Sequence, residues 1–341
     1  MSSFTRKTVA REGLGDFIRR ITKDSAFYGP VKNADNVLLA ASDGEMVELD
    51  YANSKIPLKS LFFPQNEMIC SFEDGEIRNA ALPDDKVVVF GPRPCDVRAL
   101  LVMDKVFGSD VQDPYYLRRR DNTTVIALAC KDPARTCFCT AFGGSPSGGD
   151  GADVLASDLG EVLLLEALTG KGEHMLKTQG EALQAAKDTH LKTRDELAAA
   201  AEEKIRQISI EGVSKVLEDS FSSSFWDEIH KTCLGCGVCT YLCPTCHCFA
   251  FAEERRASES EGVRFRLWDS CQYPAFTLEA SGHNPRVSSK ERMRQRIMHK
   301  FSYYPDNFDE VACVGCGRCV ENCPVNLDLR EVVSLIREES R

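Results

Sequence analysis

The pattern of apolar positions in the N-terminal part of the chain predicts alternating strands and helices. Residues Val87–Phe90 form a continuous apolar run that stops at Gly91 and Pro92, as a buried strand would. Over residues 96–107 the apolar side chains recur at helical spacing, which predicts a helix directly after this strand. A second apolar run, 124–129, repeats the layout further along the chain. We therefore expect an α/β fold in this part of the protein.

The same criteria predict further elements. Leu14, Phe17 and Ile18 would form the buried face of a helix over residues 11–23. Short strands are expected at 37–40, 46–49 and 161–165, and helices at 180–208 and, in part, at 214–229. We place a domain boundary near residue 225, which divides the chain into an N-terminal α/β domain, 1–225, and a C-terminal domain, 226–341.

Eight cysteines of the C-terminal domain repeat one spacing twice. Each run reads Cys-x-x-Cys-x-x-Cys-x-x-x-Cys-Pro. This spacing holds the two [4Fe–4S] clusters of bacterial two-cluster ferredoxins, because three thiolates on a tight turn bind one cube and the fourth completes the other. The first cluster is therefore assigned to Cys233, Cys236, Cys239 and Cys323, and the second to Cys313, Cys316, Cys319 and Cys243. Structural zinc is the alternative, which two complete runs disfavour. This predicts an α-helical, ferredoxin-like C-terminal domain.

Four more cysteines are expected at one edge of the N-terminal sheet. Cys95 follows the strand Val87–Phe90, and Cys130 follows the strand at 124–129. If the two strands are parallel neighbours, both thiols emerge where open α/β sheets place their ligands, and Cys137 and Cys139 lie in the next loop. Four thiols are enough for a third iron–sulfur cluster, which is our prediction. Buried hydrophobic thiols, zinc and a redox disulfide are the alternatives.

A long insert, residues 245–312, separates the two cysteine runs. It contains Cys246, Cys248 and Cys271, which could pack against the clusters or ligate a further group together with a donor from elsewhere. The sequence does not decide between these roles, and it assigns none to Cys70. The start of the insert completes Cys-x-x-Cys-His, the attachment motif of c-type haem. We reject haem because Cys243 is already a ligand in the ferredoxin pattern and because c-type haem is attached outside the cytoplasm.

The insert also carries a basic tract over residues 286–300. Its cations are Arg286, Lys290, Arg292, Arg294, Arg296 and Lys300. A solvated charged face is one explanation for such a tract. Two others are cations that offset the negative charge of nearby clusters, and a docking surface for an acidic partner.

Composition narrows the class of protein. The 341 residues carry a formal net charge of −10, whereas nucleic-acid-binding domains are basic. No apolar run is long enough for a membrane span, and the first residues lack an apolar export signal. Sixteen cysteines in such a chain indicate metal ligands in a reducing cytoplasm, in keeping with an anaerobic host. A dinucleotide fingerprint and a hydrolytic triad are both absent from the sequence.

Several motifs resemble one family over nearly the whole chain. They are CPTCHCF (243–249), WDSC (268–271), SGHNPR (281–286), RQRIMHKF (294–301), CVGCGRC (313–319), GPRPCD (91–96) and CFC (137–139). The chain resembles the iron–sulfur electron-transfer subunits that include the sulfhydrogenase beta subunit and its counterpart in anaerobic sulfite reductase. The resemblance implies a complex with a flavin subunit that handles NAD(P)H. It also implies a terminal redox subunit, which would be a hydrogenase, a sulfite reductase or a heterodisulfide-reductase-like module.

Taken together, the residues predict a non-catalytic electron-transfer component of an oxidoreductase complex. Two alternatives belong to other classes. One is an enzyme that reduces a sulfur substrate at the N-terminal cysteines, and the other is a zinc-stabilised binding module. Iron and sulfide analysis separates the last from the other two.

Overall fold

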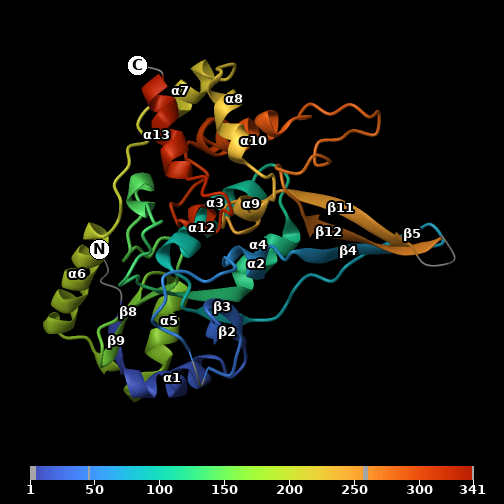
Figure 1. Ribbon diagram of the computed structural model, residues 1–341. Coiled ribbons are helices and arrows are strands. Elements are labelled where there is room, and N and C mark those ends of the chain that lie inside the picture. Colours follow the sequence, from blue (N-terminus) through green and yellow to red (C-terminus); the bar gives the residue numbers. More distant parts are fainter. Residues whose placement is uncertain (1–4, 45–46, 256–259, 340–341) are drawn as a thin grey trace. The chain divides into compact units, whose positions relative to one another are not determined.

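The computed structural model describes residues 5–44, 47–255 and 260–339, and the chain forms two compact units (Figure 1). The first unit comprises Met1–Leu58, Asp84–Gln207 and Val314–Gly317. The second comprises Lys59–Pro83, Ile208–Cys313 and Arg318–Arg341. Each unit therefore contains segments that are distant in sequence. The boundary expected near residue 225 stays a prediction about where the ferredoxin-like section begins.

The first unit is built on an eight-stranded sheet with the order β10-β1-β9-β8-β7-β6-β2-β3. The strands are β1 (Arg6–Ala10), β2 (Ala26–Asn33), β3 (Asn36–Ala41), β6 (Val87–Phe90), β7 (Thr123–Leu128), β8 (Val154–Asp158), β9 (Val162–Ala167) and β10 (Gln184–Ala185). The central strands β2, β6, β7 and β8 are parallel to one another, and the pairs outside them are antiparallel. The predicted α/β fold is confirmed.

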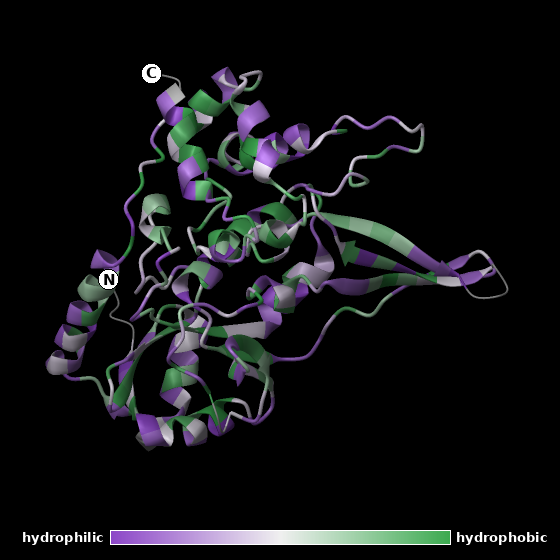
Figure 2. Cartoon of the chain, viewed as in Figure 1, coloured by the Kyte–Doolittle hydropathy of each residue, from purple (hydrophilic) through white to green (hydrophobic). Residues whose placement is uncertain are grey.

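Helices surround this sheet because its central strands are apolar on both faces. Ile126, Leu128 and Leu165 are fully buried, and Figure 2 shows these strands in the colours of hydrophobic residues. On one face the core includes side chains of α1 (Leu14–Ile21) and α5 (Gly170–Thr178). The helix α3 (Pro94–Phe107) packs against β7. The remaining helices are α4 (Pro114–Asn122) and α6 (Asp188–Glu203).

Most predicted elements of this unit exist, with shifted ends. The helix expected over 96–107 is α3, which begins two residues earlier because Pro94 fits the first turn of a helix. The helix expected over 180–208 is shortened to α6, since a 3₁₀ turn and β10 occupy its start. Of the strand expected at 46–49, Met46 lies outside the described residues. Val47–Leu49 are not a strand, although the Glu48 N–H donates one hydrogen bond to Pro30 O at 2.7 Å.

The second unit contains a four-stranded antiparallel sheet that the sequence did not predict. Its order is β11-β12-β4-β5, with β4 (Asn66–Glu73), β5 (Glu76–Asn79), β11 (Phe249–Arg255) and β12 (Glu261–Trp268). The hairpin β11–β12 comes from the insert and pairs with a hairpin that lies far earlier in the chain. Figure 2 shows β11 changing from hydrophobic to hydrophilic along its length.

Short helices form the rest of the second unit. They are α2 (Lys59–Phe62), α7 (Val213–Asp219), α8 (Phe225–Ile229), α9 (Val238–Tyr241), α10 (Ser289–Met298), α11 (Tyr304–Phe308), α12 (Arg318–Glu321) and α13 (Leu329–Glu339). A π-helical turn, η5 (His299–Tyr303), interrupts the helix between α10 and α11 and contains the buried Lys300. Such turns are frequent at functional sites. Among the described residues, no helix is long and apolar enough to cross a membrane.

The two cysteine runs fold alike. In the first, Gly235 and Gly237 have φ values of 67° and 75°, and in the second Gly315 and Gly317 have 62° and 76°. These left-handed conformations favour glycine and turn the backbone between successive cysteines. The third cysteine of each run lies in one helical turn, α9 or α12, and the fourth follows the end of that turn. The repeat in the sequence is therefore also a repeat in backbone conformation.

Candidate metal centres

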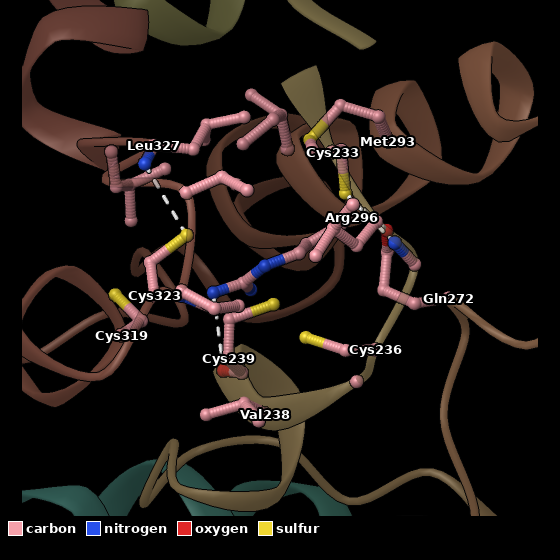
Figure 3. Close-up of a pocket in the computed structure, with 17 residues that line it drawn as sticks. Cys233, Cys236, Val238, Cys239, Gln272, Met293, Arg296, Cys319, Cys323 and Leu327 are labelled. Atoms are coloured by element: carbon pink, nitrogen blue, oxygen red, sulfur yellow. Dashed lines mark hydrogen bonds between the residues drawn. The ribbon is translucent and has the colours of Figure 1, made fainter. Parts of the chain in front are cut away.

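The first pocket brings together the four cysteines that the spacing assigns to one cluster. Cys233, Cys236 and Cys239 from the first run line it, and Cys323 from the end of the second run lines it too. Figure 3 shows these sulfur atoms around one space, with Cys319 at its edge. The wall is apolar and includes Met293 and Ile297 of α10 and Leu329 of α13. Such a wall limits the access of water to whatever the thiols hold.

Backbone N–H groups point at two of these sulfur atoms. The Leu327 N–H donates to Cys323 Sγ at 3.2 Å, and the Gly235 N–H donates to Cys233 Sγ at 3.4 Å. Hydrogen bonds to ligating sulfur are one of the means by which a protein sets the reduction potential of an iron–sulfur cluster. The backbone within the first run and just after the second therefore contributes to the pocket.

The buried side chain of Arg296 indicates whether an anionic group would fit this pocket. Its side chain is 5% exposed and lines the pocket, and its Nη2 donates to Cys239 O at 3.2 Å (Figure 3). Its Nη1 is buried without a hydrogen-bond partner among the described residues. Burial alone would lower the pKa of Arg296, but neighbouring thiols, Cys239 foremost, raise it well above its usual value. The pocket is thus suited to a cluster carrying thiolate charge.

A second buried cation lies at Cys243. Lys300 Nζ is 3.2 Å from Cys243 Sγ, and it also donates to Thr245 Oγ1 at 3.0 Å and Ala312 O at 2.8 Å. Lys300 is 2% exposed. Hydrogen bonding from Cys246 is the largest cause that lowers the pKa of Cys243 well below its ordinary value, and Lys300 adds to it. The Cys243 thiol therefore loses its proton more readily than an ordinary cysteine thiol does.

The other ligands assigned to the second cluster lie in different parts of the fold. Cys313 and Cys319 belong to the second unit, with Cys243. Cys316 belongs to the segment Val314–Gly317, which is part of the first unit. The assignment of Cys316 to the second cluster therefore continues to rest on the spacing of the run.

The N-terminal cysteines line one hollow of the first unit. The strands β6 and β7 are parallel neighbours with Phe90 opposite Ile126, so the segments that follow them start from one edge of the sheet. Cys95, Cys130, Cys137 and Cys139 all line the hollow, and Cys316 lines it as a fifth cysteine. Among the described residues, no three His, Cys, Asp or Glu side chains are grouped tightly enough to hold a single metal ion.

Polar groups surround this hollow as well. Asn53 Nδ2 donates to Cys316 O at 2.9 Å, and Cys95 Sγ donates to Asn53 Oδ1 at 3.6 Å. Arg93 is 3% exposed and lies with its guanidinium 4.0 Å from the centre of the Tyr51 ring. Its Nε is buried without a hydrogen-bond partner among the described residues. An anionic group in the hollow would suit this cation.

Burial favours the protonated form of three thiols of the hollow, those of Cys130, Cys137 and Cys139. It raises the pKa of Cys130, and with the thiol of Cys130 nearby it raises the pKa of Cys137 to about 12 and of Cys139 to about 11. A metal centre binds thiolates and therefore displaces these protons. Occupancy of the site is accordingly expected to release protons.

Within the first unit, the segment Val314–Gly317 packs closely on the loop that carries Cys137 and Cys139. The Phe138 N–H donates to Gly315 O at 2.8 Å. A Cβ on Gly315 would approach Phe138 O to 2.4 Å, and a Cβ on Gly317 would approach Thr136 to 2.6 Å. Both glycines are thus required by packing as well as by their left-handed conformation.

Sequence reasoning missed two cations of these sites. Arg93 occurs between prolines, and Lys59 occurs between Leu58 and Ser60 in a largely apolar stretch, yet both are buried. The apolar residues Ile56–Leu58 and Leu61–Phe63 on either side were the available signal for Lys59, although lysine is almost never fully buried unless it is paired.

Comparisons with known proteins define first the class and then the family. A family model described as a 4Fe-4S dicluster domain matches residues 232–327, so the chain is an iron–sulfur protein. It is 31% identical to sulfhydrogenase 2 subunit beta of Pyrococcus furiosus over 326 residues, which cover 95% of this chain and 96% of the relative. The chain belongs to the family of iron–sulfur electron-transfer subunits that includes this protein. It is an iron–sulfur electron-transfer subunit of an oxidoreductase.

Proposed function

We propose that the chain relays single electrons between a flavin- and NAD(P)H-binding reductase subunit and a terminal redox subunit. The observation that supports this best is the first pocket, where Cys323 joins three cysteines of the other run beside the partnerless Nη1 of Arg296. When bound, [4Fe–4S] clusters supply one-electron redox chemistry at roughly −400 mV. The chain itself holds the ligands, excludes water and places cations beside them.

The ligand sets are those that the spacing and the strand ends indicate. Cys233, Cys236, Cys239 and Cys323 would hold the first cluster, and Cys313, Cys316, Cys319 and Cys243 the second. Cys95, Cys130, Cys137 and Cys139 would hold a third. The first and third sets each line a single space that contains a buried arginine. Cys316 lines the third space too, so a ligand of the second cluster would adjoin the third.

The partners follow from what this chain lacks and from its family. Its sequence has no dinucleotide fingerprint, so NAD(P)H chemistry is assigned to another subunit. The relative is named as one subunit of a sulfhydrogenase. A hydrogenase, a sulfite reductase or a heterodisulfide-reductase-like module would be the terminal partner, and the free thiols favour the reducing cytoplasm as the compartment.

Anaerobic purification of the tagged chain from its native host tests the proposal. We expect a flavin-containing subunit and a terminal redox subunit to co-purify, and we expect electron transfer from NAD(P)H to require both. The isolated chain should not reduce polysulfide from an artificial electron donor. Turnover by the isolated chain would contradict the relay and favour the sulfur-reducing alternative at the N-terminal cysteines.

Cys130→Ser tests the third cluster. The variant is expected to lose about four irons and as much sulfide per chain while the ferredoxin-type clusters remain, because Cys130 lines only the N-terminal hollow. Iron and acid-labile sulfide analysis provides the measurement. Cys70→Ser is the matched control, since Cys70 is a buried thiol of β4 and belongs to none of the three ligand sets. Equal iron in Cys130→Ser and Cys70→Ser would remove the third cluster from the proposal.

A further inference from the structure

The two cysteine runs begin with turns of the same backbone conformation, but the surroundings of these turns differ. In the second run, Val314 is 3% exposed and Cys316 is 8% exposed. The residues at the same positions of the first run are Leu234, which is 69% exposed, and Cys236, which is exposed as well. All sixteen cysteines lie in the part of the chain that the structure describes, and Cys236 is the only exposed one among them. The first turn is therefore open where the second is covered.

The middle glycine of each turn shows the same difference. A Cβ on Gly315 would lie 2.4 Å from Phe138 O, and the Phe138 N–H donates to Gly315 O at 2.8 Å. The loop around Phe138 that covers this turn also carries two cysteines assigned to another centre. Beyond its chain neighbours, a Cβ on Gly235 would meet a single atom of the described residues within 4 Å, Gln272 O at 3.7 Å. The first turn thus has room for a covering segment.

The open turn borders the first pocket. Leu234, Cys236 and Pro324 are exposed residues that line this pocket, and we refer to them as the pocket mouth. Figure 3 shows the Cys236 side chain pointing into the space that it shares with Cys239 and Cys323. A cluster held by these thiols would lie close to an exposed and largely apolar surface. Because electron transfer slows steeply with distance, the pocket mouth offers a short path between the cluster and another protein.

The charged side chains just before the first turn are paired with opposite charges. Lys231 pairs with Glu228 at 2.6 Å, and Asp227 pairs with Lys290 at 2.8 Å. These pairs leave little net charge for electrostatic steering, which needs complementary potentials on the two proteins. An apolar partner surface therefore suits the pocket mouth better than the acidic surface considered for the basic tract.

The exposed cysteine distinguishes the pocket mouth from ordinary exposed apolar residues. A single exposed leucine is common on protein surfaces. At the pocket mouth, however, an assigned cluster ligand is exposed beside it, and the shell around an iron–sulfur cluster controls both its contact with water and its potential. The second turn shows how a turn of this conformation is closed, namely by a loop whose backbone donates to the middle glycine.

We propose that the pocket mouth docks an apolar loop of a redox subunit that exchanges electrons with the first cluster. The loop would donate a backbone N–H to Gly235 O, as Phe138 does to Gly315 O, and would carry a residue that binds the partner's own redox group. One electron passes between that group and the cluster, so that one is oxidised as the other is reduced. The inference rests on the proposed electron relay and names the surface at which the relay leaves this chain.

Leu234→Glu in the full-length chain, purified anaerobically with its partner subunits, tests this inference. Glutamate would place an unpaired charge in an apolar contact, so electron transfer from NAD(P)H through the complex to the terminal subunit should slow about tenfold or more. Iron, sulfide and the EPR signals after reduction with dithionite should match wild type, because Leu234 is 69% exposed in the chain. Leu278→Glu is the matched control, since Leu278 is 55% exposed and does not line the pocket. High salt should change the wild-type rate little.

A photo-crosslinker identifies the protein that covers the pocket mouth. With benzoylphenylalanine in place of Leu234, irradiation of the complex should link the chain to a redox subunit, and with benzoylphenylalanine in place of Leu278 it should not. Links from position 234 to a second copy of this chain, or no links, would overturn the inference. Equal rates in Leu234→Glu and Leu278→Glu would overturn it too. A wild-type complex that holds clusters but passes no electrons from NAD(P)H would instead contradict the relay itself.

Discussion

Replacing Cys323 with serine is expected to remove the cluster held by the first cysteine run, although Cys323 lies at the end of the second. Cys323 lines the pocket with Cys233, Cys236 and Cys239, and its sulfur accepts a hydrogen bond from the Leu327 N–H. Serine places a weaker, protonated ligand at that corner, since iron–sulfur clusters are held by thiolates. We expect a loss of about four irons per chain, measured by iron analysis and by EPR of the reduced protein.

Cys319→Ser is the matched control for this experiment. Cys319 lines the same pocket, but the interleaved spacing assigns it to the other cluster. Combined with Cys236→Ser, the Cys323→Ser change should therefore cause no further loss of iron, whereas Cys319→Ser should cause an additional one. The opposite result would be a further loss of iron when Cys323→Ser is added to Cys236→Ser and no further loss when Cys319→Ser is added. That result would show that Cys319, and not Cys323, is the fourth ligand of the first cluster.

Replacing Lys300 with methionine should make the potential of the second cluster more negative by about 60–130 mV. Reduction adds negative charge, and the ammonium group 3.2 Å from Cys243 Sγ stabilises the reduced state. A hydrogen bond to a charged group contributes about 1.5–3 kcal/mol, and for one electron about 1.4 kcal/mol corresponds to 59 mV. Potentiometric titration followed by EPR measures the shift, and Lys300→Arg should retain most of the wild-type value.

Lys290→Met is the control for charge in general. Lys290 belongs to α10, the helix before the π-helical turn, but its side chain pairs with Asp227 at 2.8 Å and is 29% exposed. Solvent and salt screen such a charge, so Lys290→Met should leave the reduction potentials of the two ferredoxin-type clusters nearly unchanged. Equal shifts in Lys290→Met and Lys300→Met would mean that net charge, rather than the contact with Cys243, sets the potential. An unchanged potential in Lys300→Met with full iron content would refute the role of Lys300.

The first unit was largely predictable because its signals are local. Continuous apolar runs marked β6 and β7, and the rule that parallel strands end at one edge placed Cys95 and Cys130 beside one hollow. The strand expected at 46–49 is not formed over its described part, Val47–Leu49, because an apolar pattern does not ensure a partner strand. Among the described residues of this segment, one backbone hydrogen bond, from the Glu48 N–H to Pro30 O, reaches β2.

The second unit was less predictable because its contacts are distant in sequence. The strand β12 pairs with β4, nearly two hundred positions earlier, as in the pair Arg266 and Glu67 with a sequence separation of 199. No local pattern encodes such a partner. The burial of Lys59 and Arg93 was also hidden, since charged residues are expected at the surface unless something pairs with them. By contrast, the suggestion that cations of the tract 286–300 offset cluster charge stays a prediction, now attached to Arg296 and Lys300.

An EPR-monitored redox titration of the full-length chain, combined with iron, sulfide and zinc analysis, tests the central claim most directly. The electron relay predicts equal amounts of iron and acid-labile sulfide, no stoichiometric zinc, and EPR signals of reduced clusters that appear as one-electron transitions near roughly −400 mV. Stoichiometric zinc without sulfide, in a protein that stays EPR-silent after reduction with dithionite, would contradict it.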